Sequence, residues 1–388
     1  MLRRVTTLAV LALYASAPAQ TSAAPTKGLV QVRALYLEWS GALARVDAVA
    51  KDLKDAPRDS ELFRQLSARL QELTKLASKP QQAFQQAFAS AEWSRLDVQS
   101  DAALLRDALP VLARDYAQPR AAIAAGRFFM ANFAGDERAA TVAGTSLPMA
   151  LLAGGDGAEA KRQLERALVG AKGAAKTKLL LTLGDVAAAD GEREQAIRCY
   201  ELAGADADAK EKKAIAMRRE LIGKPAPVIN SRNWFGAEPR SLMSMRGKVV
   251  LIDFWASWCP PCRTIMGTLD ELHGANRAAG LEVIGLTRSY PNGYLPADRK
   301  QLRTGGTALQ GLDEQHYREH VAAFRKNTGI SYPFVLGTEQ DFKTYQISSI
   351  PTVVLVGRDG RISAVMMGAS CEPVLRYAVA KALGESKR

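Results

Sequence analysis

Residues 249–262 read VVLIDFWASWCPPC and place two cysteines, Cys259 and Cys262, directly after an apolar run. The run at 249–255 predicts a buried strand, and residues 263–279 predict a helix. A Cys-x-x-Cys at a strand-to-helix junction is the arrangement of a dithiol redox centre. Because two thiols at this spacing can close into a disulfide with little backbone movement, the pair can accept or donate two electrons.

The two cysteines have distinct predicted roles. Cys259 would lie at the helix N-terminus, where free amides and the helix dipole stabilise a thiolate, so it is the predicted nucleophile. Cys262 lies one turn further in and is the predicted resolving thiol, which attacks a mixed disulfide. Pro260 and Pro261 remove two amide donors, which limits stabilisation of the thiolate. The alternative is a structural pair, but no second close cysteine pair exists to complete a zinc site.

Two further positions are candidates for chemistry. Asp253 lies within the apolar run, where a buried acid is costly. We interpret it as a proton acceptor of raised pKa that assists Cys262 through a water, the alternative being an acid in solvent at the strand edge. Pro351 precedes a strand, and such prolines are sometimes cis. If it is cis, the backbone of Ile350 would be exposed beside the thiols and could pair with an extended substrate.

The sequence beyond residue 222 alternates between predicted strands and helices. Helical periodicity stops at 220–224, so the domain boundary is predicted there. The predicted strands are 249–255, 281–286, 332–336, 352–356 and 362–367, and the predicted helices are 263–279, 313–327 and 372–383. This order predicts an α/β sandwich with a mixed central sheet.

Residues 222–387 resemble thioredoxin-fold domains of the TlpA/ResA type, a family of exported thiol–disulfide oxidoreductases. The resemblance rests on four segments: IGKPAP at 222–227, GKVVLIDFWASWCPPC at 247–262, YQISSIPT at 345–352, and Asp359-Gly360 in the last hairpin. It implies a cis peptide bond before Pro351, a nucleophilic Cys259, a resolving Cys262 and a buried acid. It covers a little under half of the chain and does not extend to the helical part.

The predicted site has a catalytic part and a substrate-binding part. The catalytic residues are Cys259, Cys262, Asp253 and Pro351, of which the first two form the redox-active disulfide. The substrate-binding residues are Trp258, Pro260, Pro261, Ile350 and Thr352. The prediction includes no metal and no cofactor. The sequence holds no haem-attachment Cys-x-x-Cys-His and no dinucleotide-binding glycine pattern in a strand–helix context.

One segment departs from the family pattern. Extra residues at 287–312 carry two tyrosines and four basic side chains, namely Tyr290, Tyr294, Arg288, Arg299, Lys300 and Arg303. Ligand sites in α/β sheets gather at the carboxyl ends of parallel strands, so the insertion is a candidate to overhang the thiols and select substrates. The alternative is a mobile solvated loop.

Residues 25–221 predict an all-α domain, because apolar residues recur at helical spacing and strand signals are nearly absent. Breaks are predicted at 54–58, Pro80, Pro110 and Pro119. Within 120–208, small and large residues follow the spacing of a tetratricopeptide repeat, so a short array of paired helices competes with a generic helical bundle.

The N-terminus, residues 1–24, predicts a secretory signal peptide: two arginines, a short apolar stretch and small-residue cleavage sites. Export is expected, most simply to the bacterial periplasm, with no stable membrane span after cleavage; the alternative is an anchor formed by an uncleaved N-terminal segment. The net charge of +12 is spread along the chain without a dense basic block, so nucleic acid is not a predicted partner.

The two remaining cysteines and one histidine motif give weaker signals. Cys199 falls on a predicted repeat helix and Cys371 opens the last predicted helix; the sequence leaves open whether they are free or bridged. The segment His316–His320 matches a His-x-x-Glu-His pattern of some zinc peptidases. Because it lies inside the thioredoxin-like region, we interpret it as a chance match rather than a metal site.

The first functional interpretation is an exported protein-disulfide reductase, with disulfide-containing proteins as substrates. The resemblance implies a membrane-bound thiol carrier as electron donor, and the helical domain would recruit partners. A second hypothesis is a helical scaffold with an accessory redox-sensing domain. A third is a thiol peroxidase on the same fold, but Ile252 and Ala256 stand where those enzymes place Pro and Thr before the reactive cysteine.

Overall fold

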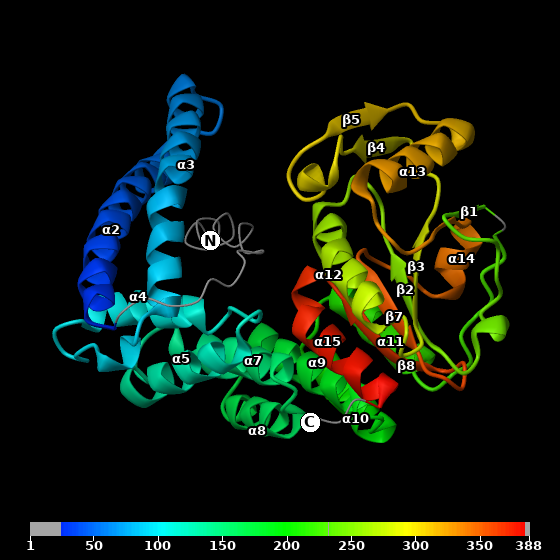
Figure 1. Cartoon of the computed structure of the whole chain (residues 1–388), viewed down its shortest axis with the longest axis horizontal. Helices are drawn as coiled ribbons and strands as arrows, with labels where there is room; N and C mark the ends of the chain where they lie inside the picture. Colours follow the sequence, from blue (N-terminus) through cyan, green and yellow to red (C-terminus); the bar gives the residue numbers. More distant parts are fainter. Residues whose placement is uncertain (1–24, 232, 385–388) are drawn as a thin grey trace. The chain divides into compact units, whose positions relative to one another are not determined.

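The structure is a computed structural model that describes residues 25–231 and 233–384. The predicted signal peptide at 1–24 lies outside the described residues. Among the described helices, none combines the length and the apolar character needed to cross a bilayer. The chain forms two compact units that divide between Val142 and Ala143, and each unit is described by itself (Figure 1).

The first unit is all helical, as predicted. Its helices are α2 (Pro25–Asp55), α3 (Glu61–Ser90), α4 (Ala102–Leu112), α5 (Pro119–Asn132) and α6 (Ala139–Thr141). Helices α2 and α3 form a long hairpin, and a buried aromatic cluster around Phe84 and Phe129 joins it to α4 and α5. The predicted breaks at Pro80 and Pro110 are wrong: α3 and α4 continue through these prolines. A proline removes one backbone bond, a cost that packing of the helix can offset.

The second unit begins with helices that sequence periodicity also predicts. A π-helical turn (Val142–Ser146) leads into α7 (Leu147–Ala153), α8 (Gly157–Leu168), α9 (Gly173–Ala189), α10 (Arg193–Gly204) and α11 (Ala209–Leu221). Helices α9 and α10 cross closely at Gly184, where an added Cβ would lie 2.5 Å from the ring of Tyr200. The absence of a side chain at Gly184 therefore allows this close crossing.

Beyond α11 lies a six-stranded mixed sheet in the order β1-β6-β3-β2-β7-β8. Its strands are β1 (Trp234–Phe235), β2 (Val249–Phe254), β3 (Leu281–Thr287), β6 (Phe334–Leu336), β7 (Thr352–Val356) and β8 (Ile362–Met367). Strands β2, β3 and β6 are parallel, and the remaining pairs are antiparallel. The predicted α/β architecture with a mixed sheet is confirmed.

The helices of this region are α12 (Pro260–Asn276), α13 (Glu314–Thr328), α14 (Glu339–Thr344) and α15 (Glu372–Leu383). Parallel crossovers run from β2 through α12 to β3 and from β3 through α13 to β6, so right-handed connections place both helices on one face. On the opposite face Val250, Ile252 and Phe254 pack with α11 and α14. Asp253 alternates with these residues and therefore points toward the α12 face.

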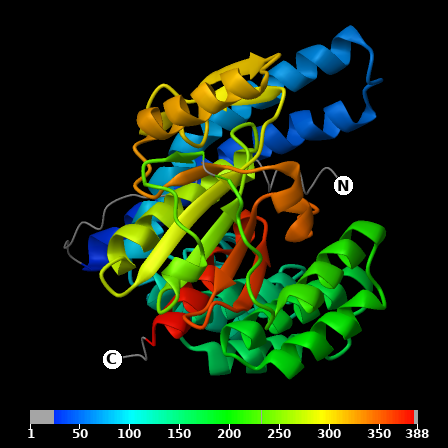
Figure 2. The same ribbon diagram turned by 90° about the vertical axis from the view of Figure 1, so that its right-hand side faces the viewer.

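The helices before residue 222 and the sheet after it belong to the same compact unit. Helix α15 lies between the sheet and the helices α7 and α9, and α9 and α11 contact β8 (Figures 1 and 2). The compact units therefore divide at 142/143, whereas the change from helices to strands falls at the predicted position near residue 222.

Candidate functional site

The two cysteines lie where strand β2 passes into helix α12. Cys259 is the N-cap residue of α12, and its Sγ is bonded to Sγ of Cys262. Only 3% of Cys259 is exposed, and Cys262 is fully buried. Pro260 and Pro261 occupy the first two helical positions and carry no N–H, whereas the amide of Cys262 donates to Cys259 Sγ at 3.3 Å. The helix N-terminus thus offers one amide to this sulfur.

A groove of about 440 Å³ opens beside the disulfide. Four of the five predicted substrate-binding residues line it together with Cys259: Trp258, Pro260, Pro261 and Ile350. Trp258 is the most exposed ring of the site, with 37% of its surface accessible. The other walls come from segments 288–290 and 342–349.

The peptide bond between Ile350 and Pro351 is cis, as the resemblance implies. Ile350 lines the same groove as Cys259. The fold therefore brings this turn close to the redox pair, although about 90 residues of sequence separate them. Thr352, the remaining predicted substrate-binding residue, is fully buried, and its hydroxyl donates to the carbonyl of Ser349 at 2.8 Å. Its side chain therefore holds the turn and does not line the groove.

Asp253 is fully buried in the middle strand of the sheet. Neither carboxylate oxygen has a hydrogen-bond partner in the described part of the chain. Burial raises the pKa of Asp253 well above its usual range, because an unpaired charge loses its hydration there. The alternative interpretation, an acid at the strand edge in solvent, is wrong. A raised pKa makes the carboxylate of Asp253 a stronger base than an ordinary aspartate, which suits it to accept a proton.

The raised pKa of Asp253 gives the stability of the protein a specific pH dependence. Below about pH 4 this carboxyl is protonated in both folded and unfolded chains. As the pH rises, the unfolded chain loses the proton before the folded chain does, so stability falls. Asp253→Asn has no such proton to lose. We expect the oxidised variant to be more stable than wild type at pH 7 by more than about 1 kcal/mol, with the gain vanishing near pH 3.

Urea unfolding of wild type and Asp253→Asn at pH 7 and pH 3 measures this difference. A variant that is no more stable than wild type at pH 7 would contradict an unpaired buried acid. An equal gain at both pH values would assign the effect to packing instead of ionisation.

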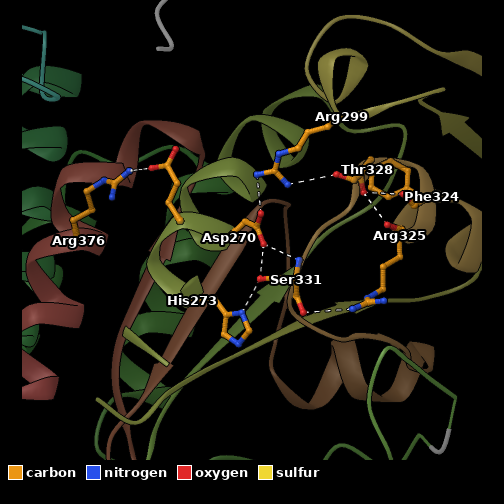
Figure 3. Close-up of polar contacts among 9 residues, drawn as sticks. Asp270, His273, Arg299, Phe324, Arg325, Thr328, Ser331 and Arg376 are labelled. Atoms are coloured by element: carbon orange, nitrogen blue, oxygen red, sulfur yellow. Dashed lines mark hydrogen bonds and ion pairs between the residues drawn. The ribbon is translucent and has the colours of Figure 1, made fainter. Parts of the chain in front are cut away.

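The insertion at 287–312 is an ordered hairpin, with β4 (Asn292–Leu295) paired to β5 (Thr307–Gln310) and a 3₁₀ turn at Arg299–Gln301. Arg299 pairs with Asp270 of α12 at 2.7 Å and donates to the carbonyl of Thr328 at the end of α13 (Figure 3). Asp270 also accepts two hydrogen bonds from Ser331. The insertion therefore has regular secondary structure and contacts two helices.

The insertion is also tied to the loop that carries the cysteines. The amide of Tyr294 donates to Ser257 Oγ at 3.1 Å, and Ser257 Oγ lies 2.7 Å from Nε2 of His320. Burial lowers the pKa of His320 to about 4, so this imidazole is neutral and shares a hydrogen bond with the serine. Sequence reasoning missed Ser257 and His320 as a pair, because 63 residues separate them.

The other cysteines and histidines that the sequence singles out do not line the groove. Cys199 and Cys371 are buried free thiols, and burial raises the pKa of Cys371 to about 12. His316 is exposed beside Asp313, whereas His320 is buried against Ser257. The described residues contain no cluster of His, Cys, Asp and Glu that could hold a metal ion.

Comparison with known proteins agrees with this geometry. Residues 222–365 match the family model described as the AhpC/TSA family. The thiol-disulfide oxidoreductase ResA of Geobacillus thermodenitrificans (strain NG80-2) is 24% identical over 159 residues, which cover 41% of this chain and 73% of the relative. The ResA protein of Bacillus anthracis is 26% identical over 148 residues, or 38% of this chain and 70% of the relative.

A solved structure titled as a putative thiol:disulfide interchange protein DsbE from Chlorobium tepidum is 21% identical, covers 42% of this chain and 98% of its own, and has a TM-score of 0.29. The family match begins at Ile222, the first residue of the predicted C-terminal domain. The C-terminal region therefore has a thioredoxin fold and is similar in sequence to the ResA-type thiol–disulfide oxidoreductases, and the region before it is all helical.

Proposed function

We propose that this enzyme, a thiol–disulfide oxidoreductase by its C-terminal domain, reduces disulfides in exported proteins. The observation that carries the proposal is the Cys259–Cys262 disulfide at the start of α12, open to a groove that also contains the cis turn at Ile350. A reversible dithiol beside a surface that can accept an extended chain is the arrangement that disulfide exchange requires.

In the proposed reaction the Cys259 thiolate attacks one sulfur of a substrate disulfide. A mixed disulfide forms and the first substrate sulfur leaves as a thiolate. Cys262 then gives its proton to Asp253, through a water, and its thiolate attacks Cys259 Sγ. The Cys259–Cys262 disulfide forms, the second substrate thiolate leaves, and two electrons have passed to the substrate. Pro351 shapes the turn that holds the substrate backbone at Ile350.

The direction of electron flow is proposed from the groups around Cys259. Strong oxidants of this kind owe their potential to a stabilised reduced form. Here Pro260 and Pro261 leave the amide of Cys262 as the donor from the first helical turn. A weakly stabilised thiolate favours oxidation of the dithiol, so the protein is proposed to be a reductant. It then needs an electron supply, for which a membrane-bound thiol carrier is the proposed donor.

The cellular location of the protein and the role of its helical region are also part of the proposed function. The signal-like residues 1–24 support export to the periplasm, with anchoring by that segment as the alternative. Residues 25–221 are proposed to bind partner proteins, with 120–208 as a tetratricopeptide-like array, and residues 222–388 to form the redox domain. The rival function, a scaffold whose redox domain acts as a sensor, predicts that function survives loss of Cys259.

The reduction potential of the Cys259/Cys262 pair tests the proposed direction. The whole chain is equilibrated with dithiothreitol or glutathione redox buffers, and the dithiol fraction is measured by thiol alkylation. We expect a value close to about −270 mV, as for thioredoxin. A value close to about −120 mV would make the protein an oxidant, and a pair that does not cycle would remove the redox function.

A further inference from the structure

The insertion that departs from the family pattern supplies one wall of the groove beside Cys259. Arg288 and Tyr290 line this groove together with Trp258. The ring of Tyr290 meets the ring of Trp258 edge to face at a centroid distance of 5.4 Å. Trp258 directly precedes the nucleophile, so Tyr290 contacts its immediate neighbour and lines the same groove as Cys259.

The hairpin holds this wall in a fixed position. Its backbone is bonded to Ser257 and its Arg299 to Asp270, as described above. Behind the wall, the ring of Tyr317 lies 5.9 Å from that of Tyr290. A wall fixed at several points can discriminate between side chains by shape, because it does not move aside for the wrong one.

Arg288 already has an acidic partner at the partly exposed edge of this wall. Its guanidinium pairs with the carboxylate of Glu339 at the start of α14. The Cζ atom of the same guanidinium lies 4.7 Å from the ring centroid of Tyr290 and 5.5 Å from that of Phe342. Glu339 is therefore the charged partner of Arg288, and the rings of Tyr290 and Phe342 lie beside its guanidinium.

The rest of the groove is also predominantly apolar. Phe342, Ile347 and Ile350 also line the groove, together with Ser348 and Ser349. A groove of about 440 Å³ has room for a large side chain as well as the backbone that carries it. An apolar side chain would bury its surface here without leaving a charge unpaired, whereas an acidic one would meet an arginine that is already paired.

We propose that the groove selects substrates in which a large apolar or aromatic residue adjoins the disulfide cysteine, and that Tyr290 and the Arg288–Glu339 pair determine this preference. This inference rests on the proposed function, because the preference for a substrate appears only in the rate at which its disulfide is reduced. Tyr290 supplies the contact area, and Glu339 keeps Arg288 from attracting acidic segments.

Three cyclic peptide disulfides, identical except for Phe, Ser or Asp beside one cysteine, test the proposal against the reduced full-length chain. Hydroxyethyl disulfide, which carries no side chain, is the reference substrate. We expect the second-order rate constant for the Phe peptide to exceed that for the Ser peptide roughly tenfold or more, and the Asp peptide to be no faster than Ser. Tyr290→Ala should bring the Phe/Ser ratio below about threefold, when each rate constant is divided by that of the same variant with hydroxyethyl disulfide.

Glu339→Gln removes the carboxylate that pairs with Arg288 but keeps a side chain of nearly the same shape. Because Glu339 is exposed, the fold should remain intact. We expect it to accelerate the Asp peptide at least about threefold at low salt, because the charge of Arg288 becomes available. Glu314→Gln is the matched control: Glu314 is exposed and occupies the same first position of helix α13. Glu314→Gln should change neither the Phe/Ser ratio nor the rate constant for the Asp peptide.

The outcomes separate the two proposals. Equal rates for the Phe and Ser peptides, a preference of wild type for Asp, or an unchanged Phe/Ser ratio in Tyr290→Ala would each overturn the inference. A reduced chain that reacts with neither the peptides nor hydroxyethyl disulfide would overturn the proposed function itself.

Discussion

Replacement of Cys259 by serine is expected to lower the rate of protein-disulfide reduction by on the order of a thousandfold or more. The reason is the loss of a thiolate: a serine hydroxyl is not ionised near pH 7 and cannot form a disulfide. The sulfur of Cys259 faces the groove, and Cys262 is fully buried behind it, so the second thiol cannot take over the attack. Reduction of insulin, with dithiothreitol regenerating the enzyme, measures the loss.

Cys262→Ser should fail in a different way. Its Cys259 can still attack, but nothing resolves the mixed disulfide, so a covalent complex with the substrate should accumulate. Electrophoresis without reductant, followed by mass spectrometry, detects that complex. A Cys262→Ser chain that turns over normally would contradict the resolving role.

The two buried free thiols provide the matched controls. Cys199→Ser and Cys371→Ser each remove a cysteine that burial keeps away from the groove, and burial raises the pKa of both thiols. Neither variant should change the rate more than twofold. If Cys259→Ser retained full function in a cell that needs the protein, the scaffold hypothesis would replace the reductase.

The parts of the site that share a local sequence pattern could be predicted from the sequence. The apolar run before Cys259 predicts β2, and the Cys-x-x-Cys at its end predicts the helix start, which the structure has at Pro260. The cis bond before Pro351 is a weak signal by itself and becomes an expectation only through the family resemblance. Asp253 could be found because an acid inside an apolar strand is costly unless it has a role.

The groove walls could not be predicted, because they depend on contacts between distant segments. Nothing local marks Phe342 or Glu339 as neighbours of Arg288, since α14 is a short helix without a clear periodic pattern. The hairpin β4–β5 was missed for a similar reason. Its strands are four residues each, and most of β5 is exposed, so the alternation that signals a half-buried strand is weak.

The extent of the second compact unit also depends on contacts that composition does not reveal. Composition changes at residue 222, yet Arg218 of α11 is buried and reaches across that position. It pairs with Asp185 of α9 at 2.9 Å and donates to the sulfur of Met367 at the end of β8 at 3.0 Å. The hydroxyl of Tyr200 donates to the same aspartate at 2.8 Å. One buried cation on α11 thus connects helix α9 to strand β8 at the edge of the sheet.

Arg218→Ala is therefore expected to destabilise the second unit by about 3–5 kcal/mol, because it leaves the Asp185 carboxylate buried with a single neutral partner. Its neighbour Arg219 is the matched control. Arg219 pairs with Glu201 at 2.9 Å, but both side chains are nearly half exposed, so Arg219→Ala should cost less than about 1 kcal/mol. Replacing both buried partners, in Asp185→Leu/Arg218→Met, should recover much of the loss, since no unpaired charge remains.

Hydrogen exchange measured by mass spectrometry shows which helices and strands Arg218→Ala destabilises. If α9–α11 and the sheet unfold as one cooperative unit, Arg218→Ala lowers protection in β2 and β8 as much as in α9. Helix α4, in the first unit, keeps its protection and serves as the internal reference. Loss of protection confined to α9–α11 would mean that the helices and the redox domain are separate folding units that divide near residue 222. Equal stability of Arg218→Ala and Arg219→Ala would contradict the buried ion pair itself.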